Sequence, residues 1–151
     1  MSAYFITGTD TGIGKTHATC ALLHRYAAAG CRALGMKPVA AGLEAGANED
    51  VTCLMAASSV SAPMAWVNPY ALQSAIAPHL AAAEEGRDIR FAPIHEALGH
   101  LRSLADVVLV EGVGGFRVPL GPEGDSADLA QTLGLPGILV VCLRLGSIKK
   151  S

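Results

Sequence analysis

The residues best suited to chemistry stand near the start of the chain, in the segment GTDTGIGKT at positions 8–16. It lies between a short apolar run and an alanine- and leucine-rich run, which favours a strand–loop–helix unit. Glycines let such a loop approach an anion, and its N–H groups converge on phosphate at the helix N-terminus. Lys15 could then reach the outer phosphates of a nucleotide, and Thr16 could coordinate Mg²⁺. The loop is one residue longer than the usual motif, with Thr9 at the usual glycine position, and a tight turn beside a surface lysine is the alternative.

Three further charged residues stand at the ends of predicted strands or the start of a predicted helix, where they could lie near this loop. Glu111 ends the apolar run VVLVE and precedes a glycine-rich turn, at the end of a strand where open α/β sheets bind ligands. Lys37 ends another apolar run and is followed by a proline turn that could aim the cation into the same crevice. Asp50 opens a predicted helix, where it either favours the helix dipole or supplies a metal contact. An exposed glutamate and a solvated lysine are the alternatives for the first two residues.

The histidines and cysteines do not form a metal-binding pattern. The four cysteines have no CxxC spacing, so we expect small buried hydrophobes, reduced thiols and a cytoplasmic location. His79 is interpreted as a packed or hydrogen-bonded loop residue, with substrate contact as the alternative. The other histidines have no matched ligand spacing; they are His17, His24, His95 and His100.

Continuous apolar strands alternating with helices predict a doubly wound α/β fold. Such strands belong in parallel sheets that helices cover on both faces. The expected strands span 3–7, 32–37, 106–110 and 137–143, and the expected helices span 15–29, 49–57, 75–85, 94–104 and 126–133. A Gly/Ala-rich loop is expected over 40–47, and residues 1–151 are read as one domain.

The composition excludes several classes of protein. The 151 residues are 51% hydrophobic and 16% charged, which excludes a disordered chain. A net charge of −2 lacks the basic surface that nucleic-acid binding needs, so no nucleic-acid partner is expected. The longest apolar runs are far shorter than the ~20 residues of a membrane span, and no secretion signal precedes the first strand.

Five segments stand in the order and spacing found in dethiobiotin synthetases: GTDTGIGKT, KPVAAG, VNPY, APHLAAAEEG and LVEGVGG. The chain resembles that family over essentially its whole length, and the first two segments are its most specific motifs. The resemblance implies a P-loop-type, mostly parallel α/β fold and a homodimeric, ATP- and Mg²⁺-dependent ligase of biotin biosynthesis. Such a ligase carboxylates 7,8-diaminopelargonate with CO₂, phosphorylates the carbamate and closes the ring to dethiobiotin, giving ADP and phosphate.

The resemblance also implies roles for the residues at matching positions. Lys37, Lys15 and Thr11 match the catalytic group, and Thr16, Asp50 and Glu111 match the Mg²⁺ ligands. The implied ATP contacts are Gly12, Ile13, Gly14, Lys15, Thr16, His17, Asp50, Glu111, Gly112, Val113 and Gly114. The implied substrate contacts are Ala41, Pro78, Ser147 and Ile148, the last two in a run that receives the substrate carboxylate across the dimer interface.

Two departures from the family pattern keep alternatives open. Ala41 replaces a serine that commonly contacts substrate, and the chain ends at Ser151, where family members continue into the adenine-reading part. We therefore expect a fold that is incomplete at its C-terminus, and a truncated, inactive nucleotide-binding module is one alternative to the ligase. A switch ATPase of the partitioning or cluster-assembly type is another, although Asp10 occupies the position of its signature lysine.

Overall fold

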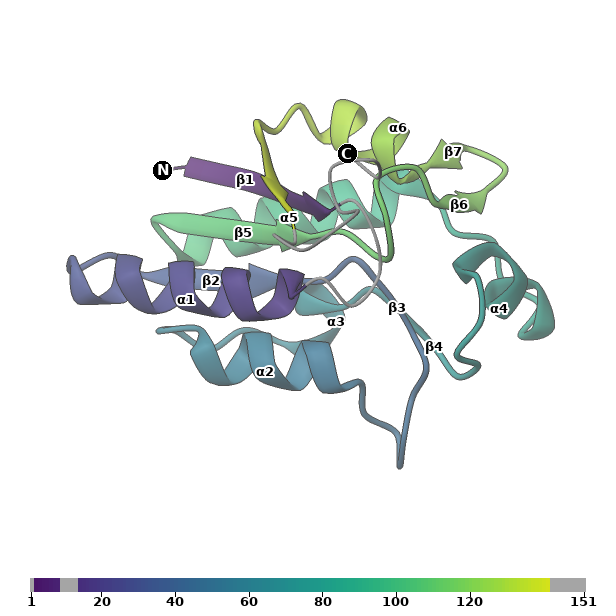
Figure 1. Cartoon of the computed structure of the whole chain (residues 1–151), viewed down its shortest axis with the longest axis horizontal. Coiled ribbons are helices and arrows are strands. Elements are labelled where there is room, and N and C mark those ends of the chain that lie inside the picture. Colours follow the sequence, from purple (N-terminus) through teal and green to yellow (C-terminus); the bar gives the residue numbers. More distant parts are fainter. Residues whose placement is uncertain (1, 9–13, 142–151) are drawn as a thin grey trace.

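A four-stranded parallel sheet forms the centre of the computed structural model, which describes residues 2–8 and 14–141 (Figure 1). The strand order is β2-β5-β1-β8. The four strands are β1 (Ser2–Gly8), β2 (Ala33–Met36), β5 (Val107–Glu111) and β8 (Gly137–Val140). Because every pairing in this sheet is parallel, the carboxyl ends of all four strands meet at one edge.

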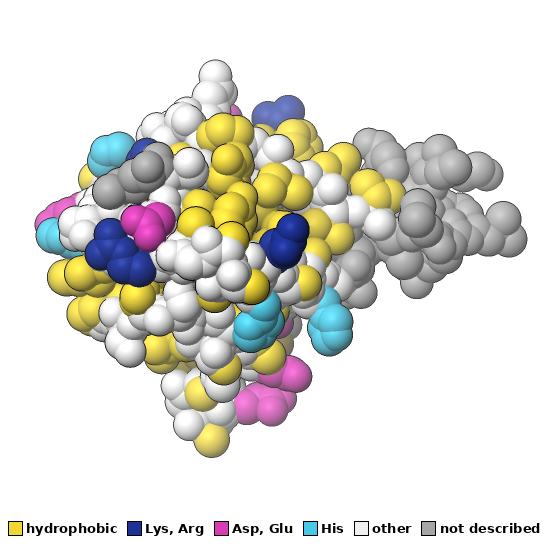
Figure 2. Space-filling model, turned by 90° about the vertical axis from the view of Figure 1, so that its left-hand side faces the viewer, with side chains coloured by type: hydrophobic (Ala, Val, Ile, Leu, Met, Phe, Trp, Pro, Cys, Tyr) yellow, Lys and Arg dark blue, Asp and Glu magenta, His cyan; other side chains and the backbone are white. Residues whose placement is uncertain are grey.

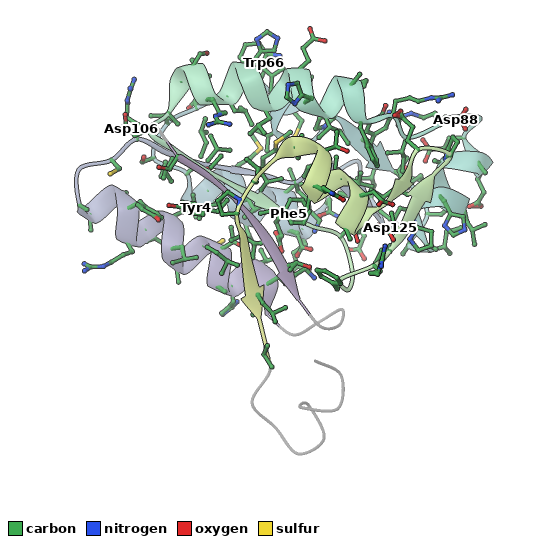
Figure 3. All side chains as sticks on the ribbon, turned by 90° about the horizontal axis from the view of Figure 1, so that it is seen from above. Tyr4, Phe5, Trp66, Asp88, Asp106 and Asp125 are labelled. Atoms are coloured by element: carbon green, nitrogen blue, oxygen red, sulfur yellow. The ribbon has the colours of Figure 1, made fainter. Side chains whose placement is uncertain are left out.

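Helices cover both faces of this sheet. Helices α1 (Lys15–Ala28) and α2 (Glu49–Ala57) lie on one face, and α3 (Met64–Val67), α5 (Phe91–Leu104) and α6 (Ser126–Leu133) lie on the other. The alternation of β5 explains this division, since Leu109 packs in the cluster with Leu23 of α1 while Val110 packs in the cluster with Leu98 of α5. Tyr4 and Phe5, neighbours on β1 labelled in Figure 3, likewise contact opposite clusters. The predicted doubly wound α/β fold is confirmed.

Two short strand pairs and one helix complete the described structure. Strand β3 (Val39–Ala41) pairs in parallel with β4 (Tyr70–Leu72), and β6 (Pro119–Gly121) forms a hairpin with β7 (Gly124–Asp125). Helix α4 spans Pro78–Glu84. The expected loop over 40–47 is therefore wrong at its start, because the backbone there pairs with β4.

Two predicted helix starts are wrong as well. The helix expected from residue 75 begins at Pro78, because Ala77 is extended (ψ 134°) and proline suits the first helical position. The helix expected from residue 94 begins at Phe91, which is buried and whose N–H donates to the Glu123 carboxylate at 3.1 Å. Residue 143, the expected end of the last strand, lies outside the described residues.

The surface at the amino ends of the strands is sparsely charged. Figure 2 shows hydrophobic side chains gathered over its middle, with charged side chains scattered around them. Cys20 and Cys31 are half-buried, but the expectation of burial is wrong for Cys53, which is exposed on α2. None of the helices in the described ranges combines the length and apolar character that crossing a membrane requires.

Gly35 lets α1 and α2 pack closely on β2. A Cβ at this position would lie 3.1 Å from Leu23 Cδ1 and 3.1 Å from Leu54 Cβ. We expect Gly35→Ala to lower the free energy of unfolding by about 1–3 kcal/mol through overpacking, measured by urea denaturation. Gly99→Ala on α5 is the matched control, because a Cβ there meets no described atom within 4 Å and alanine favours a helix. Equal stability of the two variants would contradict this packing argument.

Candidate functional site

Most of the predicted site residues within the described ranges lie at the carboxyl edge of the sheet. Lys15 and Thr16 begin α1 after β1, Lys37 follows β2, Glu111 ends β5, and Asp50 lies in the first turn of α2. They line one cavity of about 340 Å³, within the size range of small-molecule sites. Its lining residues are Gly14, Lys15, Thr16, His17, Lys37, Ala41, Asn48, Asp50, Glu111, Val113 and Gly114.

The first turn of α1 connects the phosphate-loop segment to the glycine-rich loop after β5. Lys15 is buried, and its Nζ donates to the carbonyl oxygen of Gly114 at 2.8 Å. Gly14 adopts the left-handed conformation (φ 89°) at the helix start, a conformation that favours glycine. The two glycine-containing segments that the sequence singled out are thus joined through one lysine.

Glu111 lines the cavity, and only one of its carboxylate oxygens has a hydrogen-bond partner among the described residues. Thr16 Oγ1 donates to Glu111 Oε1 at 2.6 Å, whereas Oε2 is buried and has no hydrogen-bond partner in the described part of the chain. Burial raises the pKa of the Glu111 carboxyl; the charge of Lys37 and the Thr16 hydrogen bond oppose this rise. A buried carboxylate that lacks one partner is an arrangement that a cation would stabilise.

The oxygen atoms at this point fit a magnesium ion better than a softer metal. Thr16, Asp50 and Glu111 offer one hydroxyl and two carboxylates, and Mg²⁺ usually binds one or two carboxylates together with phosphate and water oxygens. Within residues 2–8 and 14–141, no group of three or more His, Cys, Asp or Glu side chains could hold a metal ion by itself.

Lys37 is the second buried cation of the cavity, with 4% of its surface exposed. Its Nζ lies 3.5 Å from Asp50 Oδ2 and 3.4 Å from the carbonyl oxygen of Gly112, to which it donates. The Asp50 side chain is 46% exposed and therefore remains open to the cavity and to solvent. Asp50 combines both of its expected positions, since it stands in the first turn of α2 and also faces the site.

Asn48 is a site residue that the sequence analysis did not single out. Its Oδ1 accepts the N–H of Val51 at 3.2 Å and caps α2, while its Nδ2 donates to the carbonyl oxygen of Gly42 at 3.0 Å. The side chain therefore fixes the start of α2, and with it Asp50, against the segment that follows Lys37. The signal was present in the sequence, because asparagine directly before the predicted helix at 49–57 is a preferred cap.

The pKa of Glu111 gives a stability prediction for the metal-free protein. Because the folded-state pKa lies above the unfolded value, the native state binds more protons between the two values, and stability falls as pH rises through that range. We expect Glu111→Gln, which keeps the acceptor for Thr16, to raise the melting temperature in chelator at pH 7.5. The gain should vanish below the ordinary glutamate pKa, as measured by thermal unfolding across pH. A gain in melting temperature that is the same at all pH values would contradict this prediction.

Comparison with known proteins shows the family to which the chain belongs. A family profile described as "AAA domain" matches residues 2–151. The chain is 59% identical over 150 residues to "ATP-dependent dethiobiotin synthetase BioD" of Aromatoleum aromaticum, covering 97% of this chain and 67% of that one. The chain belongs to the dethiobiotin synthetase family. Proteins of the same name from Nitrosospira multiformis and Ralstonia nicotianae are 54% and 55% identical, over 96% and 95% of this chain.

The dethiobiotin synthetase relationship confirms the resemblance and disfavours the switch-ATPase alternative. The chain spans 64% of the Nitrosospira protein and 65% of the Ralstonia protein, about two thirds of the length of these curated relatives. The names of those relatives attribute ATP dependence and dethiobiotin synthesis to them.

The remaining expected contact residues differ in where the structure places them. Ala41 lines the 340 Å³ cavity and also an adjoining cavity of about 440 Å³. Pro78 is buried at the start of α4 and lines neither cavity, and His79 Nδ1 is buried without a described hydrogen-bond partner. A larger cavity of about 820 Å³ between α5 and α6 contains none of the predicted site residues. Thr11, Gly12, Ile13, Ser147 and Ile148 lie outside the described residues.

Proposed function

We propose that this chain carries out the ATP-dependent conversion of 7,8-diaminopelargonate and CO₂ to dethiobiotin, with ADP and phosphate as the other products. The convergence of two buried lysines and the Thr16–Glu111 pair in one cavity supports this proposal most strongly. The names of the relatives supply the product, dethiobiotin, and the dependence on ATP.

The reaction needs binding and charge neutralisation rather than a covalent nucleophile. One amine of the substrate attacks CO₂ and loses a proton, which gives a carbamate. A carbamate oxygen attacks the γ-phosphorus of ATP and ADP leaves. The second amine then attacks the carbamate carbon and loses a proton, and phosphate leaves as the ring closes. Carbamate and ATP are both anions, so the protein must hold like charges together.

The two lysines divide this task between them. Lys15 stands at the N-terminus of α1, where backbone N–H groups and a lysine favour the terminal phosphates of ATP. Lys37 reaches the same cavity from β2, and its ammonium is held between Asp50 and the Gly112 carbonyl. In that position it orients the carbamate and neutralises the charge that grows on the transferring phosphoryl group.

Thr16, Asp50 and Glu111 would hold Mg²⁺ in this proposal. When bound, the ion would neutralise charge on the phosphate oxygens of ATP. The unpaired Glu111 Oε2 supports this assignment, because it is a buried oxygen that nothing in the described ranges satisfies. We also propose a homodimer, which the molar mass from light scattering would test.

Diamine-dependent ATP hydrolysis tests the proposal. With Mg²⁺, ATP and bicarbonate present, phosphate release should rise at least tenfold over background when 7,8-diaminopelargonate is added. ATP binding with phosphate release that does not depend on the diamine would favour a nucleotide-binding module without ligase activity.

A further inference from the structure

The segment Val67–Tyr70, which carries the VNPY motif, runs beside the catalytic-lysine candidate Lys37. The Lys37 N–H donates to the carbonyl oxygen of Val67 at 2.8 Å, and the Tyr70 N–H donates to the carbonyl oxygen of Pro38 at 3.0 Å. Beyond these two hydrogen bonds, the two segments continue side by side as the parallel strands β3 and β4. The backbone on both sides of the lysine carbonyl is therefore docked on this motif.

Asn68 supplies the hydrogen bond between these two docking points. Its side chain is buried, and Nδ2 donates to the carbonyl oxygen of Lys37 at 2.7 Å and to that of Tyr70 at 3.3 Å. Lys37 follows the end of β2, so its carbonyl lies beyond the strand ladder and is satisfied by a side-chain amide instead. The backbone N–H of Asn68 donates to the carbonyl oxygen of Met64 at 2.8 Å, which fixes Asn68 at the end of α3.

We propose that Asn68 is a positioning residue for Lys37: its amide fixes the lysine backbone so that the ammonium stays between Asp50 and the Gly112 carbonyl. The inference rests on the proposed function, in which Lys37 neutralises the transferring phosphoryl group. Asn68 acts through Lys37 and does not line the described part of the 340 Å³ cavity.

The predicted effect of losing this amide is confined to the Lys37 side of the site. Asn68→Ala leaves the buried Lys37 carbonyl unpaired and frees the backbone that carries the lysine. Displacements of about 1 Å in a reacting geometry can lower rates about 10²-fold. In the proposed function the phosphates of ATP bind at Lys15 and the start of α1, which Asn68 does not contact through any described hydrogen bond.

Steady-state kinetics of the wild type and five variants test this inference. For diamine-dependent phosphate release, Asn68→Ala should lower kcat by about 10–100-fold and leave the KM for ATP within about twofold. In a Lys37→Ala background the same substitution should change the residual rate by less than about twofold, because both changes remove one function. Ser59→Ala is the stability control, since it removes a side-chain bond to Ala33 at the other end of β2 and should leave kcat unchanged. Asn68→Asp keeps the size but replaces the donor by an acceptor, and should also lower kcat.

The outcomes separate this inference from the function on which it rests. An active wild type with unchanged kcat in Asn68→Ala, or in Asn68→Asp if the alanine variant does not fold, overturns the positioning role alone. An equal loss of turnover from Asn68→Ala in the wild-type and Lys37→Ala backgrounds would also overturn the positioning role, because such a loss would report general destabilisation. A wild type without diamine-dependent turnover contradicts the proposed function first, and the positioning role falls with it.

Discussion

Replacing Lys37 by methionine is expected to lower kcat for diamine-dependent phosphate release by about 10²–10⁴-fold. The lysine is buried with its ammonium 3.5 Å from Asp50, and the hydrocarbon stem fills space that methionine can keep. The substitution therefore removes the charge and little of the packing. In the proposed arrangement Lys15 binds the phosphates of ATP independently of Lys37, so the dissociation constant for ATP should stay within about threefold of the wild type.

The control for Lys37→Met removes an equal charge elsewhere. Arg25 lies exposed in the last turn of α1, away from the cavity-lining residues, so Arg25→Ala should leave kcat unchanged. Isothermal titration with ATP and steady-state kinetics together separate binding from turnover. A Lys37→Met protein that has lost ATP binding, or that turns over at the wild-type rate, contradicts the role assigned to this lysine.

Replacing Lys15 by methionine is expected to weaken ATP binding by about 10–100-fold, which corresponds to about 1.4–2.7 kcal/mol. Lys15 is buried at the N-terminus of α1, and its Nζ reaches the glycine loop after β5, so its charge is poorly screened by solvent. AMP, which lacks the outer phosphates, should bind with nearly the same affinity before and after the substitution. Titration of ATP and AMP into both proteins measures this difference.

The outcome for Lys15 differs from that for Lys37 in a way that tests the division of labour. When ATP is raised until it saturates the weakened site, Lys15→Met should turn over at a measurable fraction of the wild-type rate. Lys37→Met should not recover turnover when ATP is raised. Unchanged ATP affinity in Lys15→Met would contradict the assignment of the loop to phosphate binding.

Local signals predicted those parts of the fold that local residues determine. Helices α2 and α6 begin and end where the sequence places them, because Asn48 and Asp125 cap their first turns through side-chain bonds. The three-residue strands β3 and β4 carry no local period and exist because they pair with each other. Helix α5 begins earlier than its pattern indicates, since the Phe91 ring is buried by the rest of the core.

The same distinction applies to the candidate site. The types of residue at Lys15, Lys37 and Glu111 follow from motifs and from their places at strand ends, so the sequence could nominate them. Their partners come from distant segments: the Thr16–Glu111 bond joins residues 95 positions apart, and the Asn68–Lys37 bond joins residues 31 apart. No local pattern encodes such pairs, which is why the contact of Asn68 with Lys37 could not be predicted, whereas Asn48 stood directly before a predicted helix as a preferred cap.

The most direct test of the proposed reaction follows the carbon of CO₂ into the product. The purified chain is incubated with 7,8-diaminopelargonate, ATP, Mg²⁺ and ¹³C-bicarbonate, and the products are analysed by mass spectrometry. We expect dethiobiotin carrying one ¹³C in its ureido carbonyl, formed only with ATP and in equal amount to ADP. Consumption of ATP without labelled dethiobiotin, at ATP concentrations that saturate the enzyme, would contradict the assignment of ligase activity to this chain.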